Sequence, residues 1–382
     1  LAQEYHDLLR EWETGDETSP VFTEPWILQV IHGFDLAKTP ITGHPHVKEF
    51  LWTEWDIAKQ MRTMQGSKEM SLRQLSRLCL SRQRTLRKRS EEIEKEIDDD
   101  VYRIYKTSKE DIDLIERELG LRGNLRGNKE TPTLDKAQII EYIERMLSYF
   151  VKRAIESDED GIVPFDEMFP DNLTSKVRQL IADTFGADQA DRVEQELYQL
   201  LGVALKEWLA QRYFDSHVSL YKNRPIFWQL TSYEHGRSRS PPGVFSCFIH
   251  YHRLTRDTIP KIRAFYLQRV KEALTREKEH LSRVVEAARA TGNGSRINRL
   301  SKVYESTQSK IDELERFEAT LLTVHNPRKD KTVLPKKAKW VDMAIAEVRD
   351  NGWNPFIDYG VRVNIEPLKE AKLLHPAADR VK

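Results

Sequence analysis

The sequence predicts a mainly α-helical protein with a long antiparallel coiled-coil hairpin and a small β-hairpin or sheet. Apolar residues recur at helical spacing along most of the chain. A glycine-containing turn, Thr291–Ser295, separates two long apolar stripes of this kind. Residues with high β-propensity gather in two short segments, 225–231 and 244–251.

Composition limits the classes of function. The 382 residues include 61 basic and 61 acidic side chains, so a polyanion could bind only through a local patch. Cys79 and Cys247 lie far apart and form no C-x-x-C pair, which favours a reducing compartment and excludes zinc held by cysteines. No run of 18 apolar residues occurs, so we expect a cytoplasmic protein without membrane contact. The chain begins at Leu1 rather than Met, which suggests a processed, truncated or incomplete sequence.

The first predicted segment, residues 1–65, is aromatic-rich, irregular and helical. Its tryptophans and phenylalanines are interleaved with prolines, which is typical of short helices joined by turns. The aromatic rings could stack on bases, but packing into a core is the stronger interpretation. The second segment, residues 66–122, contains one long helix from about Glu69 to Tyr105. The helix has a basic half, with seven basic residues from Arg73 to Arg89, and an acidic half, with seven acids from Glu91 to Asp100.

Four further segments follow a Gly/Asn-rich linker at 120–129. A helical bundle is predicted at 133–215, with a short extended piece at 162–165, and a small β element at 216–257. The coiled-coil hairpin is expected at 258–325, where Asp257 or Thr258 can cap the first helix and Pro260 lies in its first turn. A C-terminal tail, 326–382, begins with a basic loop and ends compactly.

Basic residues on the long helix are the main candidates for DNA binding, because arginines along a helix can meet successive phosphates. The alternatives are pairing with a neighbour of opposite charge or a solvated face. The loop between the two β segments is a second candidate, and a plain solvent loop is the alternative there. The candidate residues are Arg73, Arg77, Arg82, Arg84, Arg87, Lys88 and Arg89 on the helix, and Arg237 and Arg239 in the loop.

No catalytic motif is found. The sequence has no phosphate-binding P-loop, no zinc-protease helix and no nucleophile elbow. His250 and His252 share a face if they lie on a strand, but no further ligand completes a metal site. We therefore assign no catalytic residue, no metal and no cofactor to this chain.

Three landmarks give a resemblance to a known family. They are Arg224-Pro-Ile-Phe-Trp-Gln-Leu230, the run from Phe248 to Pro260, and Asp358-Tyr-Gly-Val-Arg-Val-Asn-Ile-Glu-Pro-Leu368, with the predicted hairpin between the last two. In this order they resemble the C-terminal region of PglX, the adenine-specific DNA methyltransferase family of BREX phage-defence systems. The matching positions that we single out are Arg224, Trp228, Tyr251, His252, Arg253, Arg256, Asp257 and Asn364.

This resemblance implies a part in DNA methylation, but it places no catalytic residue in this chain. The family's glycine-rich loop for S-adenosylmethionine and its N-P-P-Y motif are not found, and Asn354-Pro-Phe356 lacks the second proline and the tyrosine. S-adenosylmethionine is thus implied for the full enzyme only. The signature around Tyr251 could contact DNA or another domain. We favour a structural role, in which Arg253 or Arg256 pairs with Asp257 and Asp257 caps the helix.

The resemblance therefore predicts a non-catalytic C-terminal region that engages DNA and interacts with other parts of a phage-defence DNA adenine-N6 methyltransferase. Its expected partners are double-stranded DNA, an upstream methyltransferase domain and other defence-system proteins. The alternative is a helical adaptor that binds proteins through its coiled coil without touching DNA. A nuclease would need a carboxylate–lysine constellation that the sequence does not show.

Overall fold

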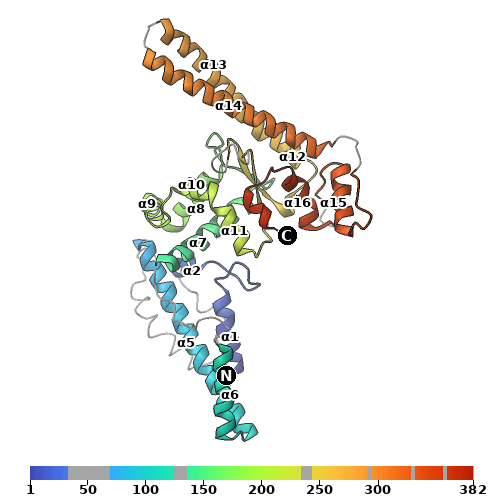
Figure 1. The fold of residues 1–382 in the computed structure, drawn as a ribbon. Coiled ribbons are helices and arrows are strands. Elements are labelled where there is room, and N and C mark those ends of the chain that lie inside the picture. Colours follow the sequence, from blue (N-terminus) through green and yellow to red (C-terminus); the bar gives the residue numbers. More distant parts are fainter. Residues whose placement is uncertain are drawn as a thin grey trace. The chain divides into compact units, whose positions relative to one another are not determined.

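The computed structural model describes residues 1–32, 69–123, 136–233, 243–290, 294–327, 332–355 and 359–381. It forms two compact units: one made of Leu1–Phe150 and Arg178–Val203, the other of Val151–Val177 and Ala204–Lys382 (Figure 1). The candidate loop arginines Arg237 and Arg239 lie outside the described residues, as do the aromatic residues after position 32 of the first segment. The six predicted segments stay a prediction about how the chain is organised.

Most of the described chain is helical, which confirms the predicted fold class. The α-helices are α1 (Ala2–Glu13), α2 (Trp26–His32), α5 (Leu72–Tyr105), α6 (Lys109–Gly123), α7 (Lys136–Glu156), α8 (Leu173–Phe185), α9 (Ala190–Leu201), α10 (Leu205–Gln211), α11 (Tyr213–Leu220), α12 (Thr258–Lys261), α13 (Gln268–Ala290), α14 (Gly294–His325), α15 (Trp340–Asp350) and α16 (Gly360–Glu370). Short 3-10 turns occur at Tyr251–Arg253 and Pro376–Arg380. Among the described residues, no helix is both long and apolar enough to cross a membrane.

In the first unit, α1 and α2 pack against the long helix α5 (Figure 1). The predicted long helix is confirmed, and its start follows from a capping box in which Ser71 and Gln74 satisfy each other's backbone N–H groups. It ends at Lys106, which adopts the left-handed conformation. The start of α5 is also held to α9, because the Glu196 carboxylate accepts a 2.7 Å hydrogen bond from the backbone N–H of Leu72.

The aromatic residues that the structure describes in the first segment favour the packing interpretation. Trp26 is buried, and the ring of Phe22 meets that of Tyr149 on α7 edge-on at 5.9 Å. Trp12 is 37% exposed. No stack of exposed parallel rings is seen among these described residues, so a base-stacking platform gains no support there.

The second unit contains a three-stranded antiparallel sheet made of β1 (Ile162–Pro164), β2 (Phe227–Thr231) and β3 (Ser246–His250). The strand order is β1-β3-β2, so β3 lies in the centre. The predicted pair of strands is confirmed, and the short extended piece at 162–165 supplies the third. The strands are buried almost throughout, since helices and the C-terminal residues cover them.

Two long helices of the second unit, α13 and α14, pack side by side and run in opposite directions (Figure 1). Their three connecting residues, 291–293, lie outside the described part of the chain. A π-helical turn, Ile262–Leu267, precedes α13. It shifts the helical register by adding a residue to the turn, and Phe265, which we expected in the apolar stripe, is 57% exposed. Knobs-into-holes packing of the two helices stays a prediction.

Candidate nucleic-acid interface

The basic half of α5 presents four of its seven cations on one side. Arg73, Arg77, Arg84 and Lys88 are exposed, and their positions fall within about 60° of one another around the helix axis. They extend over roughly 22 Å at 1.5 Å per residue. We call these four residues the α5 stripe. A line of exposed cations of this length can meet several successive phosphates of a nucleic-acid strand.

Two further cations of this half, Arg82 and Arg89, pair with carboxylates of α1. Arg82 is buried and forms an ion pair with the buried Glu11 of α1. Arg89 donates to Glu4 of α1 from two of its nitrogens, at 2.9 Å and 2.8 Å, and also lies near Glu92 and Glu96. Both arginines therefore fasten α1 to α5. Since their charges are already matched by carboxylates, they are poorly suited to bind phosphate.

Arg87 has an intermediate position. Its Nε donates to Glu91 one turn later at 3.1 Å, and its side chain is 27% exposed. An exposed pair at this spacing is weak. Arg87 could exchange Glu91 for a phosphate, but the acids that follow it on α5 would repel that phosphate.

The acidic half of α5 limits where a polyanion can bind. Glu91, Glu94, Glu96, Asp98 and Asp99 are exposed on the turns that follow Lys88. Like charges repel, so a phosphate backbone is favoured along the first four turns and disfavoured beyond them. The charge pattern thus leaves only the N-terminal end of α5 suited to a polyanion.

The second group of candidate residues, the family-signature positions, lies in the second unit and is mostly structural. Tyr251 is buried, and its hydroxyl accepts a 3.3 Å hydrogen bond from the side-chain amide of Asn364. The backbone N–H of Tyr251 donates to Ile226 O, and Trp353 Nε1 donates to Asn364 O at 2.7 Å. The first two landmarks, which follow each other closely in the chain, therefore meet the third, whose Asn364 is more than a hundred residues from Tyr251, in one buried cluster.

Arg253 and Asp257 do not make the ion pair and the helix cap that we expected of them. The Arg253 guanidinium donates to the backbone carbonyls of Glu156 and Asp158 and does not pair with Asp257. Asp257 occupies the N-cap position of α12 but its side chain accepts no capping hydrogen bond, because its backbone is already in the helical region. Thr258, the other predicted cap, accepts a hydrogen bond from the Thr255 N–H instead.

The remaining signature positions divide between core and surface. Trp228 is buried on β2 and contacts Phe214, whereas Arg224, His252 and Arg256 are exposed. His217, which the sequence pattern does not single out, is buried and accepts hydrogen bonds from the N–H groups of Ile226 and Phe227 at the start of β2. Burial, together with the charge of Lys152, lowers the pKa of His217 to about 3, so the ring stays neutral. Its place three residues after Phe214 on an apolar helix face gives only a weak indication of this role.

Neither a metal nor S-adenosylmethionine fits the described residues. Burial, with the neighbouring charges of His252 and Arg253, lowers the pKa of His250 to about 4, yet no group of three or more potential ligands occurs in the described part of the chain. A site for S-adenosylmethionine needs a glycine-rich turn between a strand and a helix beside parallel strands. Within the described ranges the sheet is wholly antiparallel and no such turn leaves it, so we derive no chemical step through this cofactor.

No family model matches the chain. Two known proteins are similar to part of it. An adenine-specific methyltransferase BrxX from Escherichia coli O9:H4 (strain HS) is 23% identical over 184 residues, which cover 44% of this chain and 14% of the relative. An adenine-specific methyltransferase PglX from Lacticaseibacillus casei (strain Zhang) is 26% identical over 171 residues, 42% of this chain and 13% of the relative. The matched part spans about a seventh of these relatives. The chain thus resembles a limited part of the adenine-specific methyltransferases BrxX and PglX, as its three landmarks predict.

Proposed function

We propose that this chain is a DNA-engaging, non-catalytic C-terminal region of a bacterial phage-defence DNA adenine-N6 methyltransferase. The observation that carries the proposal is the α5 stripe, four exposed cations on one side of a helix in a chain that resembles adenine-specific methyltransferases. Methyl transfer and S-adenosylmethionine binding belong to the rest of such an enzyme. The α5 stripe contributes affinity and position on the duplex rather than base recognition.

The geometry of α5 supports this role in two ways. Arg82 and Arg89 hold α1 against the inner side of the helix, so the outer side keeps a fixed orientation. The acidic half then confines a bound backbone to the first four turns. An enzyme that flips its target base needs such contacts outside the catalytic centre, because they hold the distorted duplex in register.

The test is the salt dependence of duplex binding by the whole chain. We expect Arg73→Gln/Arg77→Gln to weaken binding of a labelled duplex of about 30 base pairs and to reduce the slope of log K against log salt by about 2. Fluorescence anisotropy between about 50 and 200 mM salt measures both quantities.

A matched control exists on the same helix. Lys95 is exposed at the same angle around α5 as Arg77, five turns further on, but lies among the acids. Lys95→Gln should leave the affinity unchanged where Arg77→Gln lowers it. Equal effects of the two substitutions would contradict a role for the α5 stripe, and no salt-dependent binding by the unmodified chain would remove the DNA function altogether.

The second candidate is a helical adaptor that binds proteins. Ile104 and Tyr105, at the end of α5, are 74% and 78% exposed, and Leu114 on α6 is 53% exposed. Strongly exposed apolar side chains that follow one another, such as Ile104 and Tyr105, are found at protein contacts. This function would gain support if the chain bound no duplex and Tyr105→Ser abolished its association with the rest of the enzyme.

A further inference from the structure

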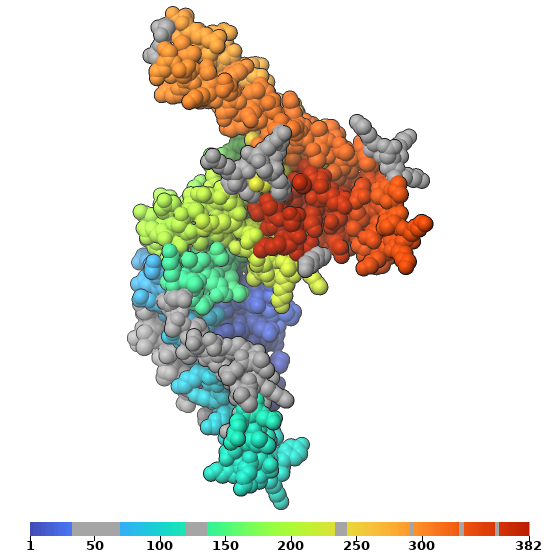
Figure 2. All heavy atoms as spheres, in the orientation of Figure 1, coloured from blue at the N-terminus to red at the C-terminus, as the bar shows by residue number. Residues whose placement is uncertain are grey.

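The distal end of the α13–α14 hairpin carries an excess of positive charge. Between Arg283 and Lys302 the sequence holds five basic residues and a single acid, Glu286. All five basic side chains are exposed: Arg283, Arg289, Arg296, Arg299 and Lys302. In Figure 2 this part of the hairpin, in orange, extends beyond the other described elements of the second unit. We call these five residues the hairpin tip.

Charges at the opposite end of the hairpin are matched. There Arg263 and Lys271 both bind Glu318, at 3.0 Å and 2.7 Å. Partial burial alone would raise the pKa of Glu318, but the hydrogen bonds and charges of these two cations outweigh it and leave the pKa below its ordinary value. At the hairpin tip, by contrast, no described residue forms an ion pair with Arg289, Arg299 or Lys302. The excess charge is therefore a local property of the tip.

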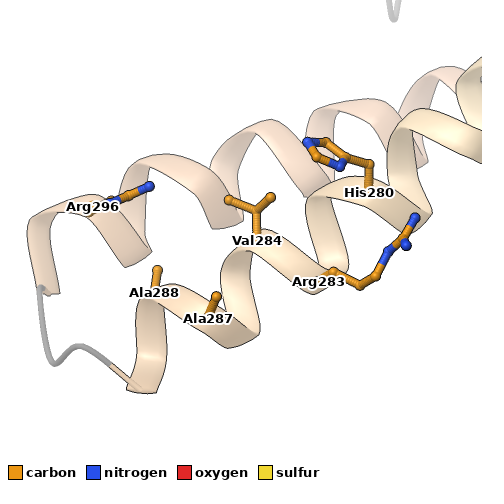
Figure 3. A pocket seen from close by; sticks show the side chains of 6 residues that line it. All are labelled: His280, Arg283, Val284, Ala287, Ala288 and Arg296. Carbon is orange, nitrogen blue, oxygen red and sulfur yellow. The ribbon is translucent and has the colours of Figure 1, made fainter.

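A shallow groove lies between the two helices at the tip. This groove of about 390 Å³ is lined by His280, Arg283, Val284, Ala287 and Ala288 of α13 and by Arg296 of α14 (Figure 3). The small alanines leave space between the charged residues. The groove contains no tryptophan, tyrosine or phenylalanine, the aromatic residues enriched at the centres of protein interfaces.

We propose that the hairpin tip binds the phosphate backbone of duplex DNA, as a contact made independently of the α5 stripe. The choice of DNA as ligand rests on the proposed function, whereas the site rests on the charge and exposure of the tip. Four of the five cations are arginines, whose planar guanidinium groups bind phosphate oxygens in pairs. Contacts from arginine and lysine side chains to phosphates carry no sequence information, so the contact is independent of base sequence.

The experiment compares two matched variants of the whole chain. Arg289→Gln/Arg299→Gln/Lys302→Gln removes three charges from the tip. Arg269→Gln/Arg276→Gln/Lys310→Gln removes three exposed charges nearer the other end of the same hairpin, where acids are frequent. We expect the tip variant to bind the labelled duplex roughly tenfold more weakly, with a salt slope smaller by about 3, and the other variant to bind as the unmodified chain does. Circular dichroism verifies that both keep their helical content.

Each outcome decides a separate question. If the tip variant binds DNA as tightly as the unmodified chain, the proposal is overturned. This outcome is expected if the ligand of the tip is an acidic protein rather than DNA. If the tip variant loses affinity while Arg73→Gln/Arg77→Gln does not, the proposal stands and the role of the α5 stripe fails. A loss that is equal in the tip variant and its control would also overturn the proposal, because it would show a general charge effect.

Discussion

The two units hold distant segments together by opposite kinds of buried polar contact. In the first unit, charged pairs join α1 to α5, with Arg82 on Glu11 and Arg89 on Glu4. In the second, neutral groups join the landmarks, with Tyr251 on Asn364 and His217 on the start of β2. A charge left unpaired in a protein interior costs far more than a neutral group left unpaired. The first unit should therefore depend more strongly on single residues, and the second should depend more on pH through its histidines.

The largest effect is expected from breaking the ionic contact. Arg82→Ala leaves the Glu11 carboxylate buried without its cation and should lower the free energy of unfolding of the first unit by about 3–5 kcal/mol. Burial already raises the pKa of Glu11 against the opposing charge of Arg82, so the substitution would raise it further. Chemical denaturation followed by circular dichroism measures the loss.

A double substitution provides the control for this change. Glu11→Leu/Arg82→Met removes both charges and fills similar space, so it should recover most of the stability. A single Arg82→Ala variant as stable as the unmodified protein would show that the pair does not hold α1 on α5.

The second effect is a loss of stability at acidic pH. The pKa of His217 is lowered to about 3 in the folded state, chiefly by burial. Below the unfolded pKa of about 6.5 the unfolded chain binds a proton that the folded chain does not, so stability falls as pH falls, by about 1.4 kcal/mol per pH unit. His250, whose pKa is lowered to about 4, acts in the same direction.

His217→Gln isolates the contribution of this ring. The glutamine oxygen can still accept hydrogen bonds from the β2 backbone but cannot take up a proton in this range. Denaturation between pH about 6.5 and 4 should show a clearly smaller slope than in the unmodified chain. An unchanged slope would assign the acid sensitivity to other groups.

The smallest effect belongs to the neutral contact between landmarks. Tyr251→Phe removes the hydroxyl that accepts from Asn364 and should cost about 1 kcal/mol of stability. In a double-mutant cycle with Asn364→Leu, the two losses should sum to more than the loss in the double variant. Simple additivity of the two losses would show that this hydrogen bond contributes no stability of its own.

Local pattern predicted the elements better than it predicted their partners. The helices at 72–105, 268–290 and 294–325 and the strands at 227–231 and 246–250 follow from apolar spacing and β-propensity, which are properties of a short window. The pairing of Ile162–Pro164 with β3 does not follow, since nothing in three residues specifies a partner more than eighty residues away.

In the candidate site, too, the sequence indicates the position of a residue better than its partner. Composition groups Arg82 with Arg77, but the spacing of Arg82 from Leu75, Cys79, Leu86 and Ile93 places it on the apolar side of the helix. Its burial could have been predicted from that spacing. Its partner Glu11 could not, because α1 contains several acids and only tertiary packing selects among them.

The central position of β3 has a consequence for dividing this protein into parts. The chain passes between the units after Phe150, after Val177 and after Val203, so no single cut releases either one intact. A fragment that starts at Ala204 keeps β2, β3 and the hairpin but loses β1. It would expose one edge of β3, whose unpaired backbone groups can recruit the same edge of another molecule. Residues 151–177 supply the strand that covers this edge, so a fragment of this region that includes them should stay monomeric where one without them associates.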